Sequence, residues 1–421
     1  MAGAVVTVRP SLSNGPMATS KKNKSLFRLI NEWLHLWLGL ATGIVVFVVC
    51  FTAAIWVFRD EVAYFTKPFN RIPPQGDRFL PPSALKQQAL HYLDSALADK
   101  PLVLQNITYR QRDRTAYVGY LDTAIGAYMG YLHLNPYTGH VVHNEVFETS
   151  RTRNFFLFIR AGHRFFWLPR HIGSPFVGAC CIVFLITLIT GLIWWYPKKW
   201  TKSTRRKSFA IKWNGSWKRI NLDLHNVLGF YTMLLAFVLT YTGVYYSFGW
   251  FRDGYHYLLG EQGQAGRVIP AATAAAAPER PGNPVDALWE QVYYGEGKSA
   301  GILDISFPAD TLAPISVTYN PDRDKYYRMY TRYFDQRSLM ELSTGGLDSR
   351  GSNQPFETLT VGQKIIRTNF DVHVGTIGGL PTKILACLVS LLGASLPVTG
   401  FIVWYNRKWG KKKLKTRIRA A

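Results

Sequence analysis

The chain has 421 residues, of which 48% are hydrophobic, 14% are aromatic and only 18% are charged. Long apolar runs alternate with polar blocks, which excludes an ordinary soluble enzyme and indicates a membrane protein with sizeable extramembrane parts. The formal net charge of +23 would suit a nucleic-acid-binding protein, but the basic residues gather beside the ends of the apolar runs. This placement is typical of membrane-topology signals and of contacts with anionic lipid. We therefore expect membrane lipid as a partner and no nucleic acid.

Four apolar stretches are long enough to cross about 30 Å of hydrocarbon at about 1.5 Å per residue. They lie at Leu36–Phe58, Phe176–Tyr196, Val227–Trp250 and Ile384–Tyr405, with Trp and Tyr gathered at their ends. Basic residues precede the first stretch, fill the loop 197–224 and form the tail 406–421. The positive-inside rule thus places both termini in the cytoplasm. The first stretch is too long for a cleaved signal peptide and is expected to remain as an anchor.

The predicted fold class is an α-helical integral membrane protein with four transmembrane helices, in two repeated helix pairs, plus extramembrane α+β domains. The expected segments, in chain order, are a cytoplasmic tail 1–28, a first span 29–58, an α+β domain 59–162, an outer segment with the second span 163–196, a basic loop 197–224, a third span 225–250, a second extramembrane domain 251–370 with a flexible linker 264–284, an outer segment with the fourth span 371–405, and a basic tail 406–421.

The extramembrane blocks carry helix and strand patterns of their own. Residues 82–98 show helical periodicity. Alternating apolar and polar residues predict strands at Leu102–Tyr109, Thr115–Leu121, Ala127–Leu134 and Val141–Val146, and in the second block at Ile302–Phe307, Ile315–Tyr319, Tyr326–Tyr330 and Arg332–Phe334. The four cysteines, Cys50, Cys180, Cys181 and Cys387, lie within apolar runs and are interpreted as small core residues.

An internal repeat is the most informative feature of the sequence. Leu34-His35-Leu36-Trp37-Leu38-Gly39 at the start of the first span corresponds to Leu224-His225-Asn226-Val227-Leu228-Gly229 at the start of the third. Thr190-Gly191 in the second span corresponds to Thr399-Gly400 in the fourth, and His163 and His373 precede these spans. The chain is therefore interpreted as two copies of a unit consisting of a helix, an outer domain and a helix.

The repeat places two histidines at each end of the predicted bundle. His35 and His225 lie at the cytoplasmic mouth, and His163 and His373 lie at the outer mouth. If the copies pack about a pseudo-twofold axis, each pair faces across it, as the axial ligands of a b-type haem do. The neighbouring Gly39, Gly229 and Gly375 would let a macrocycle approach the backbone. No Cys-x-x-Cys-His motif occurs, so haem would be bound noncovalently.

Other histidines leave alternatives open. His171 lies closer to the second span than His163 and is an alternative ligand, although the repeat alignment favours His163. His140 and His143 belong to an outer block, where they are either surface residues or contacts for substrate or metal. A histidine at a membrane interface can also serve packing alone.

The motifs resemble the PepSY-associated transmembrane helix family, iron-regulated membrane proteins that include FoxB-type ferric-siderophore reductases. The resemblance rests on the two Leu-His…Gly motifs, on Gly162-His163-Arg164-Phe165-Phe166-Trp167, on Val372-His373-Val374-Gly375, and on Leu134-Asn135-Pro136-Tyr137-Thr138-Gly139-His140, which looks like the strand-turn-strand of a PepSY unit. It implies two b haems on His35, His225, His163 and His373. It further implies reduction of ferric siderophores on the periplasmic side of the bacterial inner membrane. The second outer block has little recognisable PepSY character.

The mechanistic hypothesis is electron transfer across the membrane. A quinol or cytoplasmic reductant would supply the inner haem, and the outer haem would reduce a ferric chelate. Buried aromatics (Phe47, Phe184, Tyr231 and Tyr241) would keep the route dry, and a tyrosine-rich surface (Tyr326, Tyr327, Tyr330 and Tyr333) would dock the chelate. The alternative is a non-catalytic scaffold whose PepSY-like domains bind a periplasmic peptide or protein. A haem or metal permease is disfavoured because the spans contain few polar residues.

Overall fold

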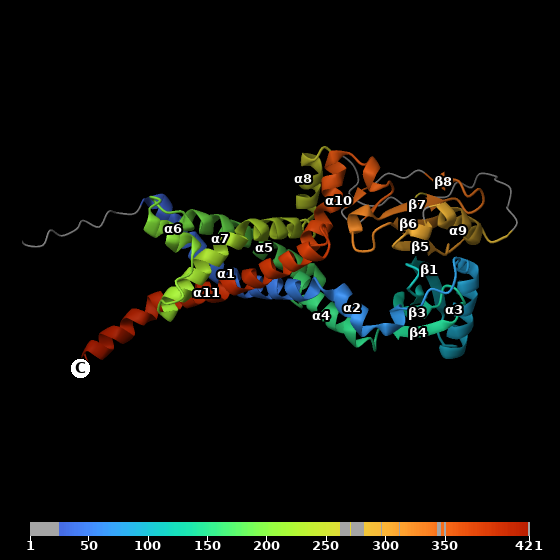
Figure 1. Cartoon of the computed structure of the whole chain (residues 1–421), viewed down its shortest axis with the longest axis horizontal. Helices are drawn as coiled ribbons and strands as arrows, with labels where there is room; N and C mark the ends of the chain where they lie inside the picture. Colours follow the sequence, from blue (N-terminus) through green and yellow to red (C-terminus); the bar gives the residue numbers. More distant parts are fainter. Residues whose placement is uncertain are drawn as a thin grey trace, which may run out of the picture.

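The computed structural model is elongated, with a helical bundle at one end and a β-sheet domain at the other (Figure 1). It describes residues 25–261, 270, 282–295, 297–310, 312–342, 347–348 and 351–419. Most of the expected N-terminal tail 1–28 and of the expected linker 264–284 therefore lies outside the described residues.

Four long apolar helices form the bundle: α1 (Leu26–Trp56), α5 (Arg170–Trp195), α7 (Trp217–Val244) and α11 (Leu380–Arg419). Each is long and apolar enough to cross a membrane. At most 33% of the apolar window of any of them is buried inside the protein, so most of the apolar surface faces outward, as lipid-facing helices require. The chain is a multi-pass membrane protein, and the four expected spans are confirmed as helices, except that the third ends at Val244 rather than at Trp250.

The helices are arranged as a ring in which α1 and α7 lie diagonally opposite. Helix α1 packs against α5 and α11, and α7 packs against the same two helices. Because α1 and α7 are the first helices of the two repeat copies, equivalent residues on them can meet across the centre of the bundle.

Shorter helices connect the bundle to the rest of the chain. They are α2 (Arg59–Thr66), α4 (Arg151–Phe165), α6 (Lys202–Phe209), α8 (Gly249–Leu258) and α10 (Val361–Val374). Helix α4 packs against α1, and α10 packs against α7. Helices α4 and α10 are capped at their C-termini by Phe166 and Gly375, both in the left-handed conformation, with φ of 53° and 77°. Each helix carries a histidine of the predicted outer pair in its last turn.

The sheet domain consists of two lobes with the same topology. The first lobe has helix α3 (Pro82–Ala96) and strands β1 (Leu102–Arg110), β2 (Ala116–Asp122), β3 (Ala127–Leu134) and β4 (Val141–Val146). The second has helix α9 (Pro284–Gly295) and strands β5 (Ile302–Ser306), β6 (Ile315–Asn320), β7 (Tyr330–Phe334) and β8 (Glu341–Leu342). Antiparallel pairing of β1 with β5 joins them into one sheet in the order β4-β3-β2-β1-β5-β6-β7-β8. A short hairpin of β9 (Leu347–Asp348) and β10 (Gly351–Ser352) lies outside it.

One core stabilises both lobes. Leu85 and Leu93 of α3 and Leu288 and Trp289 of α9 are almost completely buried, in a single apolar cluster with side chains from β1 to β7. A lone four-stranded lobe of this size would bury little apolar surface, so we interpret the fused sheet as one folding unit. The second lobe thus repeats the first in fold, even though its sequence shows little of the repeat.

The predicted strands are confirmed to within two residues except at one segment. Residues 326–330 were expected to form a strand, but Tyr326–Arg328 form a 3-10 turn and only Tyr330 belongs to β7. The buried guanidinium of Arg367 explains the difference, because it donates hydrogen bonds to the backbone carbonyls of Tyr326, Tyr327 and Met329. Those carbonyls are therefore not available to a neighbouring strand.

Candidate cofactor sites in the bundle

The structure brings His35 and His225 together at the end of the bundle away from the sheet. They lie on the diagonal helices α1 and α7, and their ring centroids are 6.4 Å apart. We call them the inner pair. They are four residues or more beyond the first turn of their helices, where backbone geometry is regular and the imidazole direction is set by the helix face.

His163 and His373 meet at the end of the bundle nearer the sheet. Their ring centroids are 6.0 Å apart, and they come from the last turns of α4 and α10. We call them the outer pair. His171, the alternative to His163, is exposed in the first turn of α5 and lines neither of the cavities described below.

Each imidazole is anchored through Nδ1. His35 Nδ1 lies 3.1 Å from the carbonyl oxygen of Thr187 and 3.2 Å from the hydroxyl of Thr190. His225 Nδ1 lies 3.0 Å from the hydroxyl of Thr399, the repeat equivalent of Thr190. A hydrogen bond from Nδ1–H to an oxygen fixes the tautomer with an unprotonated Nε2, which is the form that binds a metal.

The outer pair is anchored in the same way. His163 Nδ1 donates to the carbonyl of Val49 and His373 Nδ1 to that of Leu239, each at 2.9 Å. Because both carbonyls lie on the first helix of their repeat copy, the two histidines are held in equivalent orientations. The hydrogen bonds described here for the four imidazoles all use Nδ1, so none of them occupies Nε2, the nitrogen that would bind a metal.

The separation within each pair fits a metal ion between the rings. A transition metal binds an imidazole nitrogen at about 2 Å, and that nitrogen lies about 1 Å from the ring centre, so two axial imidazoles set their ring centres about 6 Å apart. Both pairs match this value. Among the described residues, no three His, Cys, Asp or Glu side chains are grouped to hold a metal by themselves. A metal here would need further ligands of its own, as a haem iron has.

A cavity surrounds each pair. The inner cavity, lined by His35 and His225, has a volume of about 680 Å³, and the outer cavity, lined by His163 and His373, about 260 Å³. Side chains such as Leu36, Leu188 and Met233 line the former, and Val49, Ala53 and Leu239 the latter. Concave, mostly apolar sites with a few polar groups are typical of cofactor binding.

Three glycines leave room for the imidazoles, a role that the sequence did not predict for them. A Cβ on Gly191 would lie 2.9 Å from His35, on Gly243 2.8 Å from His373, and on Gly400 3.1 Å from His225. Gly191 and Gly400 belong to the repeated Thr-Gly motif, so the repeat already marked these two positions in the sequence. Of the glycines expected to lie beside a macrocycle, Gly39 and Gly229 line the inner cavity, whereas Gly375 caps the C-terminus of α10.

One aromatic side chain separates the two cavities. Phe184 is 8% exposed, lies in the bundle core with Val46, and lines both cavities together with it. The expectation that Phe47 and Tyr231 are also buried is wrong, because they are 38% and 58% exposed and face outward from the bundle. Each predicted span has apolar residues around most of its circumference, but only one side of the helix packs inside the bundle. Tyr241 is half-buried and packs against Phe251.

The expected tyrosine surface does not form. Tyr330 and Tyr333 are each 5% exposed, since both lie in β7 within the sheet. Tyr327 packs against Phe356, and the Tyr326 hydroxyl accepts a hydrogen bond from Arg59 at 2.6 Å. The second lobe is thus fastened to the start of α2 through Tyr326.

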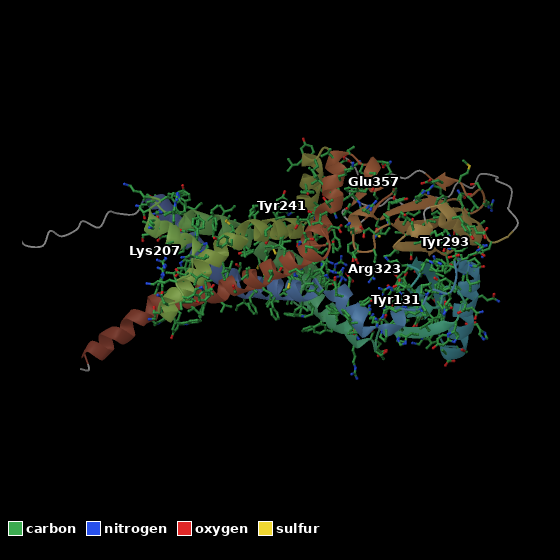
Figure 2. All side chains as sticks on the ribbon, in the orientation of Figure 1. Tyr131, Lys207, Tyr241, Tyr293, Arg323 and Glu357 are labelled. Atoms are coloured by element: carbon green, nitrogen blue, oxygen red, sulfur yellow. The ribbon has the colours of Figure 1, made fainter. Side chains whose placement is uncertain are left out.

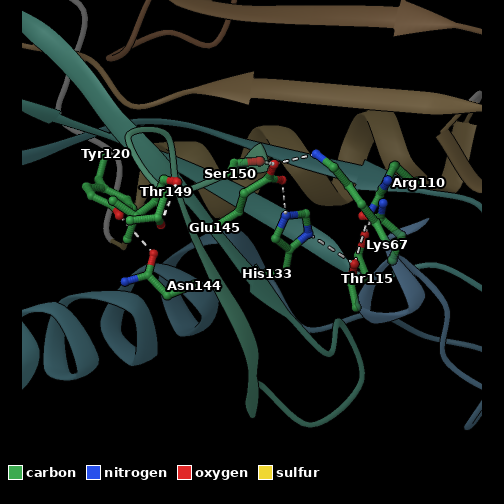
Figure 3. Close-up of polar contacts among 11 residues, drawn as sticks. Lys67, Arg110, Thr115, Tyr120, His133, Asn144, Glu145, Thr149 and Ser150 are labelled. Atoms are coloured by element: carbon green, nitrogen blue, oxygen red, sulfur yellow. Dashed lines mark hydrogen bonds and ion pairs between the residues drawn. The ribbon is translucent and has the colours of Figure 1, made fainter. Parts of the chain in front are cut away.

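The sheet domain holds a buried polar network around His133 (Figure 3). His133 Nε2 lies 3.5 Å from the Glu145 carboxylate, which also accepts hydrogen bonds from Lys67 and Ser150. Burial lowers the pKa of His133 to about 4. Burial alone would raise the pKa of Glu145, but the hydrogen bonds from His133, Lys67 and Ser150 outweigh it and lower that pKa to about 2. The network holds the segment after α2 against β4.

The two outer histidines left open by the sequence lie at the surface. His140 is exposed beside the turn before β4, and His143 is exposed with its ring stacked on Phe69 at 4.0 Å. The four cysteines are free thiols within the bundle helices.

Residues 32–407 match the family model described as the PepSY-associated TM region. The match takes in both repeat copies, the four histidines of the two pairs and the sheet domain. No curated protein matches the chain.

Proposed function

The chain belongs to the family of PepSY-associated TM regions, and on that premise we propose that it is a membrane reductase that binds two b haems and passes electrons to a ferric chelate. Family membership suggests an iron-regulated membrane protein. The observation that carries the proposal is the pair of facing imidazoles at each end of one bundle, with centroids 6.4 and 6.0 Å apart.

His35 and His225 would hold the inner haem, and His163 and His373 the outer one. When bound, each haem supplies an iron that takes up and releases one electron. The anchors on Nδ1 keep the imidazoles in place during this change, because Thr187, Val49 and Leu239 present carbonyls fixed in regular helices. A fixed ligand geometry means that little rearrangement accompanies electron transfer.

The bundle would keep water out of the path between the two sites. Val46, Phe184, Leu188, Ala236 and Val389 form a buried apolar cluster at its centre. An apolar surrounding also stabilises a macrocycle whose faces are apolar. Electrons would enter at the inner pair from a quinol or a cytoplasmic reductant and leave at the outer pair.

The acceptor we propose is the Fe(III) of a siderophore presented at the sheet end of the bundle, in the periplasm of a bacterium. Each ferric ion takes up one electron and becomes Fe(II), which hard oxygen ligands hold less tightly than Fe(III). No bond of the chelator has to break. The protein therefore needs to supply only haem ligation, insulation and a docking surface.

The first test is a reduced-minus-oxidised visible spectrum of the detergent-purified full chain, with pyridine haemochrome quantification. We expect a b-type spectrum and about two haems per chain, and reduction of a ferric hydroxamate by the dithionite-reduced protein. Protein that binds no haem when produced with haem in excess would contradict the proposal. It would favour the scaffold function, in which the sheet domain binds a protein partner.

A further inference from the structure

A buried asparagine lies beside His35 in the inner pair. Asn31 is four residues before His35 on α1, so both side chains project from the same face of the helix. The Asn31 amide Nδ2 donates to the carbonyl of Thr190 at 2.9 Å, and the hydroxyl of this threonine lies 3.2 Å from His35 Nδ1. Gly191, the next residue, leaves room for the ring. The asparagine therefore holds the turn of α5 that in turn holds the imidazole.

The second repeat copy has the same arrangement around His225. Asn221 is four residues before His225 on α7, and its Nδ2 donates to the carbonyl of Thr399 at 3.0 Å. The Thr399 hydroxyl lies 3.0 Å from His225 Nδ1, and Gly400 follows Thr399 in α11. We call the asparagine, the threonine and the glycine around one histidine its Asn-Thr-Gly set.

The set occurs a third time, around His373 of the outer pair. Asn369 is four residues before His373 on α10, and its Nδ2 donates to the carbonyl of Thr242 at 3.3 Å. The Thr242 hydroxyl lies 3.3 Å from His373 Nδ1, and Gly243 follows Thr242. Tyr241, the residue before Thr242, is labelled in Figure 2 in the half of the bundle nearer the sheet. The third set thus lies at the opposite end of the bundle from the first two.

The recurrence of the set distinguishes it from an ordinary contact between helices. Asn31, Asn221 and Asn369 are 5%, 2% and 2% exposed, and a buried amide destabilises a protein unless it is hydrogen-bonded. Any backbone carbonyl on a neighbouring helix would satisfy that need. In all three cases, however, the carbonyl belongs to the threonine whose hydroxyl meets the histidine. We therefore interpret the amides as part of the support of the imidazoles.

His163 lacks the asparagine and the glycine of this set. Ile159, which carries no polar group, is four residues before it on α4, and Ala53 takes the place of the glycine. Thr52 stands at the position of the threonine, and its hydroxyl donates to carbonyls of its own helix. Among the described residues, Thr52 has no hydrogen bond to His163, which keeps only the contact of Nδ1 with the Val49 carbonyl.

We propose that Asn31, Asn221 and Asn369 are positioning residues for three of the ligand histidines, and that His163 is the axial ligand that a small uncharged molecule replaces. The inference rests on the proposed function and adds that the two ligands of the outer haem are held unequally. The replacement breaks the bond from the iron to His163 Nε2 and forms a bond from the iron to the incoming molecule, and no electron is transferred. One hydrogen bond changes an equilibrium constant by about fivefold.

The first experiment compares two threonines at equivalent positions of the repeat. Thr242→Val removes a hydroxyl that meets His373, and Thr52→Val is the matched control, because both threonines are buried and donate to carbonyls of their own helix. The readout is the low-spin ferric electron paramagnetic resonance signal of the haem-loaded full chain, which depends on the orientation of the axial imidazoles. We expect Thr242→Val to shift the outer signal and Thr52→Val to leave both signals unchanged. Equal shifts in the two variants would overturn the positioning role.

The asparagines are tested with the same readout. Asn221→Leu should shift only the inner signal, and Asn369→Leu only the outer one. Asn221→Gln, which keeps the amide, should restore part of the wild-type inner signal. A lower melting temperature in both leucine variants with both signals unchanged would show that the amides only join helices, and would overturn the proposal.

The second experiment adds carbon monoxide to the dithionite-reduced full chain and follows the Soret band and the midpoint potentials. Carbon monoxide binds the ferrous form, so it should raise the potential of the outer haem and leave that of the inner haem unchanged. Ile159→Asn/Ala53→Gly gives His163 the set that His373 has, and should weaken carbon monoxide binding by about fivefold or more. Reaction at the inner haem, no reaction at either haem, or unchanged binding in a double variant that retains two haems would overturn the assignment of His163.

The outcomes separate this inference from the proposed function. Wild-type protein that binds no haem contradicts the proposed function and the inference with it. Two haems per chain that react equally with carbon monoxide would overturn the inference and leave the four histidine ligands standing.

Discussion

The Nδ1 atom of His163 lies 2.9 Å from the backbone carbonyl oxygen of Val49, and the second repeat copy reproduces the contact between His373 and Leu239 at 2.9 Å. The two repeat copies therefore share the orientation of the imidazole as well as its position. Such a fixed orientation is needed when the imidazole binds a ligand from one particular direction. The inner pair shows the same relationship through Thr190 and Thr399.

Single histidine variants are expected to remove one haem each. His373→Ala leaves the outer site with one axial ligand and should reduce the haem content from about two to about one per chain, while His35→Ala should do so at the inner site. Pyridine haemochrome analysis and redox titration identify which haem is lost. His171→Ala is the control, because His171 is exposed and should leave both haems in place. Equal losses in His171→Ala and His373→Ala would contradict the assignment of the outer pair.

Gly243→Ala is expected to weaken the outer site without destabilising the helix. The added Cβ would lie 2.8 Å from His373 Cε1, so the imidazole must move. Alanine itself favours a helix interior by about 1 kcal/mol over glycine, so a melting temperature that holds or rises, together with lower outer haem occupancy, would identify a steric effect. Gly249→Ala is the control, since its Cβ would meet only Arg252 Nη2 at 4.0 Å.

Phe184→Ala is expected to join the two cavities. Removal of a buried phenylalanine costs about 3–5 kcal/mol, and it would also admit water between the two sites. We expect a lower melting temperature and slower reduction of the outer haem after rapid mixing with a donor for the inner one. Ile186→Ala on the same helix, where the side chain is 42% exposed, should change neither quantity by a comparable amount. An unchanged rate in Phe184→Ala would show that the partition does not control the transfer.

The bundle and its histidine pairs could be predicted because the hydropathy pattern and the internal repeat both extend over many residues of the sequence. Length and apolar composition identify four spans, and equivalent positions such as His35 and His225 must face each other once the copies pack about an axis. The predicted helix and strands of the first lobe agree with α3 and β1–β4. Apolar and polar residues alternate along these strands because one face of the sheet is buried, and this pattern can be recognised in a single sequence.

Other features depend on contacts between distant segments and could not be predicted in this way. The 3-10 turn at Tyr326 depends on Arg367, about forty residues later, and the shared sheet depends on pairing of β1 with β5 across nearly two hundred residues. Phe47 and Phe184 both read as apolar residues of a span, but only the packing of the ring decides which faces lipid. Gly191 and Gly400 were visible as a repeat, yet their contact with an imidazole needed the structure.

The sheet domain is expected to lose stability as the pH falls, because of His133 and Glu145. Burial holds the pKa of His133 at about 4, below its ordinary 6.5, so between these values the unfolded chain binds a proton that the folded chain does not. The pKa of Glu145 is lowered from 4.5 to about 2, so its contribution is complete above about 4.5 and is lost as the pH falls toward 2. Both effects act in the same direction, and each proton changes stability by about 1.4 kcal/mol per pH unit within its window.

Hydrogen exchange of β3 and β4 in the full chain, corrected for the intrinsic pH dependence of exchange, measures this directly. In the wild type, the protection of β3 and β4 should decrease as the pH is lowered from 6.5 to 4.5. The bundle helices provide an internal reference over the same interval. His133→Gln should be less protected at pH 7, because the Glu145 carboxylate loses a partner, but its protection should change little over the same interval. His140→Gln, at an exposed position of the same lobe, should follow the wild-type profile. If His133→Gln kept the full wild-type slope, proton uptake by another group would have to explain the acid sensitivity.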